Sequence, residues 1–165
     1  MNNHRCALLF AALILPPQMG AQGQSLRVVL FGQEALLSPA DLAALPRDSV
    51  QARIHDGPEQ WYAGPSLLAV LRRAGARVDT IRGPALRQVV IADASDGYRV
   101  VFSLAELAPG LGNRQVLLVD RIDGKPVPND EGPWRLLVPA DGHPTRWARQ
   151  VVAIKLEDLR PSPAP

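Results

Sequence analysis

The stretch "LRQVVIADASDGYRVVFSLAEL" (residues 86–107) contains the local patterns that decide the fold class. Its first part, residues 86–94, is rich in apolar and β-branched side chains and predicts a strand. Asp96-Gly97 then predicts a hairpin turn, and the run that ends at Ser103 predicts the returning strand. Ser103 and Glu106 have the spacing of a capping box, so a short helix is expected directly after the second strand.

The same mixture of strands and short helices extends to both sides of this stretch. Short apolar or alternating runs predict strands, and capping residues followed by an apolar helical face predict helices. We expect strands in 25–32, 49–54, 86–94, 97–103, 114–128 (with a second Asp-Gly turn at Asp123-Gly124), 134–140 and 146–157, and helices in 37–46, 64–76 and after Ser103. Strands come in runs and no βαβ unit repeats, which is typical of an α+β fold.

The N-terminal segment reads as a signal for export. The basic "MNNHR" precedes "CALLFAALILPP" (6–17), an apolar run too short to span a bilayer. Ala21 and Gly23 then stand at the −3 and −1 positions of a cleavage site. We therefore predict a signal peptide in residues 1–23, a periplasmic or secreted protein, and no membrane span after cleavage. The alternative is an uncleaved anchor, although Pro16 and Pro17 end the apolar run early.

The remainder of the chain is predicted to form one domain, residues 24–157, followed by a disordered, proline-rich tail in residues 158–165. A domain of this length buries roughly two-thirds of the surface that its unfolded chain exposes. The formal net charge is only +2, and Lys125 and Lys155 are the only lysines. Nucleic-acid binders usually carry a basic stripe, so this near-balance argues against such a partner.

Several classes of reactive site are excluded by the residue inventory. Cys6 is the only cysteine and lies inside the predicted signal, so the mature chain has no thiol for a disulfide, a nucleophile or a metal. His55 and His143 do not have the spacing of a zinc site. Glycine-rich phosphate loops and the nucleophile elbow are also absent. The sequence therefore predicts no catalytic residue and no metal ligand.

The stretch "DGHPTRWARQ" (141–150) is the clearest candidate for a binding loop. Backbone amides near Gly142 and His143, together with the guanidinium of Arg146, suit an anion, because arginine donates in a planar fork. Trp147 offers a stacking wall for a heterocycle. The alternative is an edge loop in which the arginines pair with nearby acids and Trp147 fills the core.

Arg135 is the one charge in the apolar strand of "EGPWRLLVP" (131–139). An arginine among apolar neighbours needs a partner unless it faces a cleft. The alternative is simple alternation, in which Trp134 and Leu136 face inward and Arg135 faces outward.

Taken together, several stretches resemble the molybdopterin-binding domain of the sulfite oxidase family and follow one another in the order found there. The resemblance covers nearly all of the mature chain, and its specificity comes from the ordered set rather than from any single motif. It implies a mixed, β-rich α+β fold with short helices, built around a pyranopterin cofactor that carries molybdenum. The similar stretches are "VVLFGQEALLSPADLAALP" (28–46), "YAGPSLLAVLRRAGA" (62–76), "ASDGYRVVFSLAEL" (94–107), "RIDGKPVPNDEGPWRLLVP" (121–139) and "RWARQVVAIKL" (146–156).

The resemblance also implies which positions would contact the cofactor. The family's closing Lys-Trp motif lies near the cofactor phosphate, and the family's cysteine thiolate ligates the metal from the end of the strand before the "W-x-G" element. The matching positions are Arg146 and Trp147 for the Lys-Trp motif, Gly142 and His143 in the loop before it, Arg135 for the arginine of "P-x-R-L", Asp96 and Tyr98 for the Asp-Gly-Tyr turn, and His55 or Asp56 for the cysteine.

The missing cysteine is a serious departure from the family pattern. A thiolate is a soft donor, and neither a histidine nor a carboxylate replaces it equivalently. We therefore expect a non-redox module that binds an anionic small molecule or a partner protein in the cofactor cleft. No cofactor is predicted with certainty, although the resemblance leaves molybdopterin open. The alternatives are a molybdopterin-dependent oxidoreductase of the oxo-transfer type and an accessory subunit of a redox or signalling system.

Overall fold

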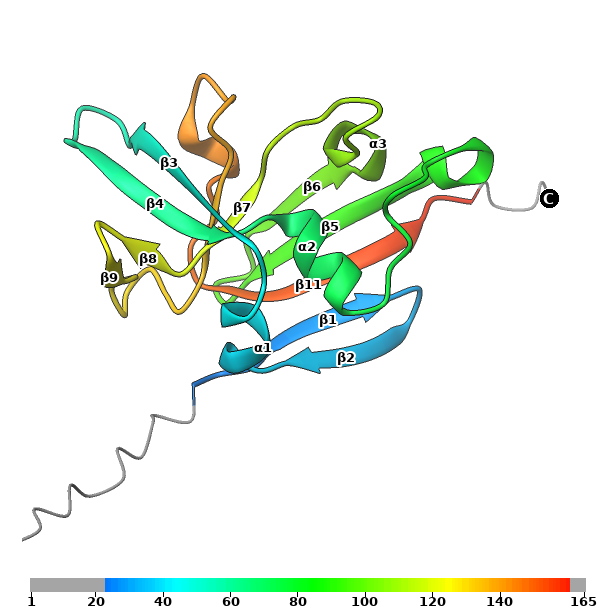
Figure 1. Cartoon of the computed structure of the whole chain (residues 1–165), viewed down its shortest axis with the longest axis horizontal. Helices are drawn as coiled ribbons and strands as arrows, with labels where there is room; N and C mark the ends of the chain where they lie inside the picture. Colours follow the sequence, from blue (N-terminus) through cyan, green and yellow to red (C-terminus); the bar gives the residue numbers. More distant parts are fainter. Residues whose placement is uncertain (1–22, 161–165) are drawn as a thin grey trace, which may run out of the picture.

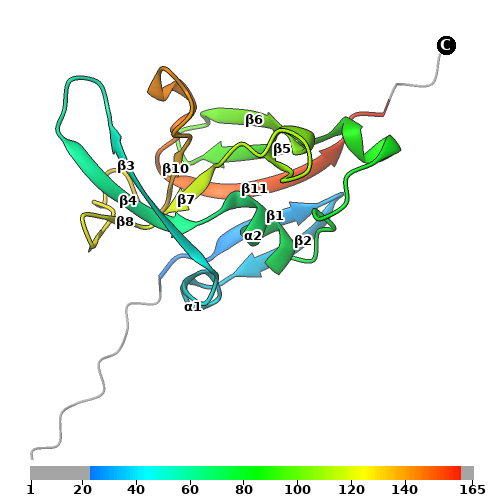
Figure 2. The same ribbon diagram turned by 45° about the horizontal axis from the view of Figure 1, so that its top comes forward.

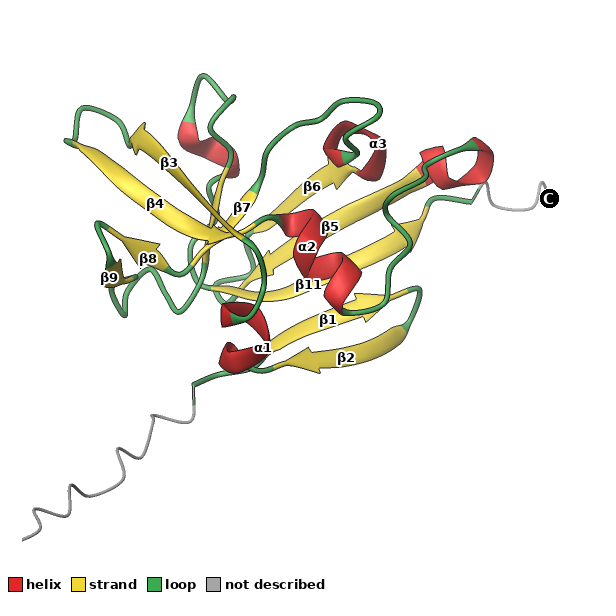
Figure 3. Ribbon diagram, viewed as in Figure 1, coloured by secondary structure: helices red, strands yellow, loops and turns green. Residues whose placement is uncertain are grey.

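The computed structural model describes residues 23–160 and confirms an α+β, β-rich chain with a few short helices (Figures 1 and 3). The strands are β1 (Leu26–Leu30), β2 (Gln33–Leu37), β3 (Arg47–Arg53), β4 (Glu59–Pro65), β5 (Gln88–Ala94), β6 (Arg99–Ser103), β7 (Leu117–Val119), β8 (Arg121–Ile122), β9 (Lys125–Pro126), β10 (Arg135–Leu137) and β11 (Val151–Asp158). The helices are α1 (Pro39–Ala43), α2 (Leu67–Arg73) and α3 (Leu104–Leu107), with 3-10 turns at Gly83–Arg87 and Pro144–Arg146.

A five-stranded sheet of order β2-β1-β11-β5-β6 forms the larger layer. The last strand, β11, lies between β1 and β5; it runs parallel to β1 and antiparallel to β5. Ile154 of β11 is in register with Val28 on one side and with Ala92 on the other. β11 therefore joins the β1–β2 pair to the β5–β6 pair at the centre of the sheet.

The second layer consists of a four-stranded sheet of order β3-β4-β8-β9 and the β7–β10 pair. The β3–β4 hairpin projects away from the five-stranded sheet in both views (Figures 1 and 2). Strands β10 and β7, which lie at the base of this hairpin, are buried at every position. The segment around residues 141–147 is close enough to this layer for Trp147 to contact Tyr62 of β4.

One hydrophobic core joins the two layers. The inner positions of β1 and β11, including Val28 and Ile154, share it with the buried face of α2, which contributes Leu67, Val70 and Leu71. Ser66 caps α2 by accepting a hydrogen bond from the amide of Ala69 at 3.2 Å. The predicted helical face of 64–76 is confirmed, although the helix itself begins at Leu67 because residues up to Pro65 belong to β4.

Two strands were not predicted from the sequence, and both lack the apolar alternation on which such predictions depend. β2 (QEALL) is an edge strand with mostly exposed side chains. β4 (EQWYAGP) ends in glycine and proline, which normally indicate a turn. Each is held by pairing with a neighbouring strand along its whole length, β2 with β1 and β4 with β3, so tertiary contacts rather than local preference decide its conformation.

Both Asp-Gly turns are confirmed. Asp123 and Gly124 both have positive φ, 49° and 76°, as a two-residue type I′ hairpin requires. Gly97 has a φ of 86°, and the Asp96 carboxylate accepts the amide of Tyr98 at 2.9 Å. The capping box at Ser103 forms only in part: Ser103 accepts from the Ala105 amide, whereas the Glu106 side chain bonds to Arg146 instead.

The predicted chain ends are only partly covered by the structure. The expected signal peptide lies outside the described residues except for its last position, and most of the expected tail also lies outside them. β11 continues to Asp158, one residue past the expected end of the domain, where the carboxylate accepts a hydrogen bond from Arg87 at 3.0 Å. In residues 23–160 no helix is long and apolar enough to cross a membrane.

Candidate functional site

A cleft, called here the hairpin cleft, lies next to the bend of the β3–β4 hairpin. It has a volume of about 320 Å³ and is lined by Ile54, His55, Glu131, Arg135, Pro144, Trp147 and Arg149. A second hollow of about 340 Å³ shares Ile54, Glu131 and Arg135 with it and continues toward Gln60 and Tyr62. Arg135 therefore lines two neighbouring hollows, and both belong to the size class of small-molecule sites.

Arg135 is buried, with 3% of its surface exposed, so the outward-facing alternative is wrong. It belongs to β10, where Trp134 and Leu136 on either side are buried as well, so the short strand has no solvent-exposed face. One terminal nitrogen donates to the Glu131 carboxylate, and the guanidinium lies 5.7 Å from the ring centre of Tyr62. The Nε atom has no hydrogen-bond partner among the described residues. A buried donor without a partner costs about 1–3 kcal/mol, so this arginine is incompletely satisfied by the described residues.

Two aromatic side chains form the wall behind Arg135. Trp147 is buried, its indole Nε1 donates to the Val138 carbonyl at 3.0 Å, and its ring meets that of Tyr62 edge-on at 6.3 Å. Burial raises the pKa of the Tyr62 hydroxyl, although the positive charge of Arg135 opposes this shift. Tyr62 is therefore neutral at physiological pH, and the wall adds no negative charge to the cleft.

The open rim of the hairpin cleft carries His55 and Arg149, both of which are exposed. His55 follows β3 with a φ of 50°, which places it at the bend of the hairpin. Among the described residues, Arg149 forms no ion pair. With one carboxylate, Glu131, and two guanidinium groups, the cleft is net positive even when His55 is neutral.

Arg146 lies in a separate ion cluster, called here the loop clasp, formed by Glu106, Arg114, Asp141 and Arg146. Arg146 donates to both oxygens of Asp141, at 2.8 and 2.6 Å, and to Glu106 at 3.2 Å. Arg114 donates to the same Asp141 carboxylate at 2.9 Å. The hydrogen bonds from Arg146 lower the pKa of Asp141, although burial opposes the shift, and the Asp141 hydrogen bond raises the pKa of Arg146. For Arg146 and Trp147 the observed geometry is thus that of the edge-loop alternative, because Arg146 pairs with acids and Trp147 is buried, whereas Arg149 forms no ion pair among the described residues.

The remaining positions implied by the resemblance lie in the 141–147 segment and in the β5–β6 turn. The Tyr98 hydroxyl donates to the Thr145 carbonyl at 2.8 Å, so Tyr98 holds the 143–147 segment against the β5–β6 turn. Asp96 orders that turn, and Gly142 and His143 are exposed. The structure therefore brings His55, Arg135 and Trp147 together in the hairpin cleft and places Arg146, Asp96, Tyr98, Gly142 and His143 outside its lining.

Some residues of the cleft were not identified from the sequence. Glu131 stands four residues before Arg135, a spacing that in a helix would suggest a pair, but here a loop brings the two together. Arg149 belongs to the quoted loop 141–150, as Arg146 does. The two differ only in the folded protein, where Arg149 lies on the rim of the cleft and Arg146 is paired with acids. Tyr62 of the second hollow opens the quoted stretch 62–76 but was not assigned to a site, because its contact with Trp147 joins segments far apart in the chain.

The donor set does not fit the molybdenum ligation that the resemblance implies. Residues 23–160 contain no cysteine, and this part of the chain has no group of three His, Cys, Asp or Glu side chains that could hold a metal ion. The position of the family's thiolate is occupied by His55 or Asp56, and the expected phosphate contact, Arg146, is already bound by Asp141 and Glu106. No reaction step through such a cofactor is derived from these residues.

Comparison with known proteins supports the fold alone. The sequence matches no family model and no curated protein. Among solved structures it is similar to the sulfane dehydrogenase SoxCD from Paracoccus pantotrophus, with a TM-score of 0.62 and 18% identity over 83% of this chain. The match spans only 39% of the SoxCD chain. The likeness supports a fold related to the sulfite oxidase-like fold that the sequence indicated.

Proposed function

We propose that this chain is a non-redox binding module of the sulfite oxidase-like fold that takes a small anionic ligand in the hairpin cleft. The observation that carries this proposal is the buried Arg135, which lines the cleft and whose Nε has no hydrogen-bond partner among residues 23–160. Arg149 and His55 at the rim add positive or proton-donating groups to the same hollow. A small anion accepts from several such donors at once, and charge-assisted hydrogen bonds of this kind are the strong ones.

The absence of a thiolate among residues 23–160 supports the non-redox part of the proposal. The fold likeness to SoxCD favours the second candidate, a molybdopterin-dependent oxidoreductase, because that protein is a dehydrogenase. The two candidates differ in one measurable quantity. Protein purified from a host that makes the molybdenum cofactor should contain no stoichiometric molybdenum by elemental analysis; a molar ratio near one would overturn the non-redox proposal.

Arg149→Gln should weaken the binding of inorganic phosphate, used as the probe anion, by about tenfold. The guanidinium is exposed and unpaired among the described residues, so its loss removes one charged donor without leaving a buried partner behind. The thermal midpoint should therefore stay within about 1 °C of wild type. Calorimetric titration gives the affinity, and a thermal melt of the same sample gives the stability.

Arg82→Gln is the matched control, because Arg82 is also exposed, forms no ion pair among residues 23–160 and lies outside the cleft. It should bind phosphate like wild type. Equal affinities for Arg149→Gln and wild type, or an equal loss in both variants, would contradict binding at the hairpin cleft.

We also propose that the protein is exported to the periplasm or beyond it. The support is the sequence of residues 1–23, which has the charge, the apolar run and the small residues of a signal peptide. Mass spectrometry of protein from the periplasmic fraction tests this: a mature chain that begins near residue 24 is expected, and retention of the whole chain in the cytoplasm would contradict it.

A further inference from the structure

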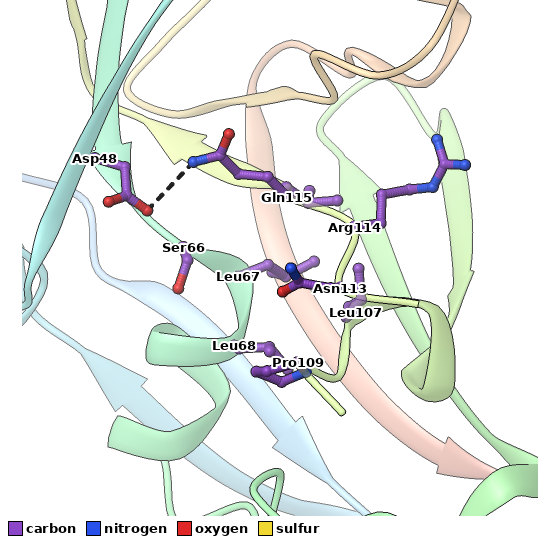
Figure 4. Close-up of a pocket in the computed structure, with 10 residues that line it drawn as sticks. Asp48, Ser66, Leu67, Leu68, Leu107, Pro109, Asn113, Arg114 and Gln115 are labelled. Atoms are coloured by element: carbon purple, nitrogen blue, oxygen red, sulfur yellow. Dashed lines mark hydrogen bonds between the residues drawn. The ribbon is translucent and has the colours of Figure 1, made fainter. Parts of the chain in front are cut away.

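A third cleft, called here the α2–α3 cleft, lies between the start of β3, the first turn of α2 and the segment that follows α3 (Figure 4). Its volume is about 400 Å³, and it shares no lining residue with the hairpin cleft. One end is polar, with Asp48, Ser66 and Gln115; the other is mainly apolar, with Leu68, Leu107 and Pro109, and has the Asn113 side chain beside Leu107 (Figure 4). The α2–α3 cleft is therefore separate from the site of the proposed function.

Asp48 is the charged group at the polar end. Its carboxylate accepts one long hydrogen bond, 3.5 Å, from the Gln115 side-chain amide and forms no ion pair among the described residues. The two side chains point toward each other across the cleft mouth (Figure 4). A carboxylate has about four lone-pair sites, so most of the accepting capacity of Asp48 remains free for a ligand.

Arg114 is the one cationic residue that lines the cleft, and its charge does not neutralise that of Asp48. Arg114 donates to Asp141 at 2.9 Å as part of the loop clasp, and its guanidinium points away from Asp48 and Ser66 (Figure 4). The polar end is therefore net negative. Ser66 adds a hydroxyl whose oxygen already accepts from the Ala69 amide, which leaves its proton to donate.

The apolar end provides burial for a hydrocarbon body. Leu107 is buried, while Leu68 is half-buried and Pro109 is exposed, so part of this surface faces the cleft rather than the core. Covering such surface favours binding, because apolar area is removed from water. A carboxylate at one end and an aliphatic surface at the other match a molecule that has a cationic head and an apolar body.

We propose that the α2–α3 cleft binds a small primary amine with an apolar body of about one ring. The ammonium group pairs with the free lone pairs of Asp48, and the ring lies against Leu68, Leu107 and Pro109. This ligand class is opposite in charge to the one proposed for the hairpin cleft, so the two sites are separable by the charge of the probe.

The test is a titration of the folded protein with 2-phenylethylamine, followed by amide chemical shifts in two-dimensional NMR. A Kd of about 1 mM is expected for a ligand of this size in an open cleft. The shifts should concentrate in residues 66–68 and 107–116, together with the Gln115 side-chain amide. Phenylacetate, which has the same ring and a negative charge, should bind this cleft at least about tenfold more weakly.

Asp48→Asn should weaken 2-phenylethylamine about tenfold while keeping the shape of the side chain and the thermal midpoint. Asp56→Asn, at the exposed bend of the hairpin, is the matched control and should bind like wild type. The proposal is overturned by equal binding of the amine to Asp48→Asn and wild type, by equal binding of phenylacetate in this cleft, or by an absence of shifts in 66–68 and 107–116 at about 10 mM ligand.

Discussion

Gly64→Ala is expected to lower the thermal midpoint by about 15 °C or to prevent folding altogether. Gly64 is buried in β4, directly against β7. A Cβ at this position would lie 2.8 Å from the Val119 Cα and closer still to the Leu118 carbonyl oxygen. Both neighbours are backbone, so β4 and β7 would have to separate. Overpacking of this kind costs about 4 kcal/mol, and a domain of this size loses about 4 °C per kcal/mol.

Gly142→Ala provides the matched control for this prediction. A Cβ at Gly142 meets nothing within 4 Å, and the residue does not have a positive φ. Its midpoint should lie within about 2 °C of wild type. Differential scanning calorimetry on both variants makes the comparison; a Gly64→Ala protein that melts near wild type would show that β4 and β7 are not in the contact described.

Asp141→Ala is expected to cost about 2–3 kcal/mol at pH 7, a midpoint loss of about 10 °C. The carboxylate side chain is only 13% exposed and joins Arg146 and Arg114, so its removal leaves two guanidinium groups side by side. Glu106 alone, which is bonded to Arg146 at 3.2 Å, compensates only one of them. The loop that carries Gly142 to Arg146 should loosen first.

The effect of Asp141→Ala should also depend on pH. The pKa of Asp141 is lowered in the folded state, so its stabilisation is present above the ordinary carboxyl pKa of about 4 and is lost as the pH falls through the folded-state value. The gap between wild type and Asp141→Ala should therefore persist from pH 7 to about pH 5 and narrow below about pH 4. A gap that grows on acidification would contradict this assignment.

Asp79→Ala is the control for the ion cluster. Asp79 is also paired with an arginine, Arg72, but both side chains are well exposed. Surface pairs of this kind contribute little, because solvent screens them. Asp79→Ala should leave the thermal midpoint and its pH profile unchanged. Asp141 and Asp79 both pair with arginine, but Asp141 is mostly buried and Asp79 is exposed. We therefore expect the difference between their effects on stability to come from burial.

Of the positions that the sequence suggested for a site, His55, Arg135 and Trp147 line the hairpin cleft, and the others lie outside its lining. Arg135 stood out as one charge in an apolar strand, and it proved to be the buried, incompletely paired donor of the hairpin cleft. Arg146 stood out equally, yet it is neutralised by Asp141 and Glu106. No local pattern separates these two arginines, because the acids that decide their roles lie on other loops and become neighbours only when the sheets assemble.

The α+β class, the two Asp-Gly turns, the Ser103 cap of α3 and the lack of a cysteine in residues 23–160 could all be predicted from the sequence. These features depend on residue identity or on contacts within a few positions, where backbone preferences and side-chain chemistry act directly. The place of β11 between β1 and β5, the strands β2 and β4, and the different surroundings of Arg135, which lines the hairpin cleft, and Arg146, which pairs with acids, became known from the three-dimensional structure. Those outcomes depend on pairings between distant segments, whose free energy comes from burial and is not encoded in any short stretch of the chain.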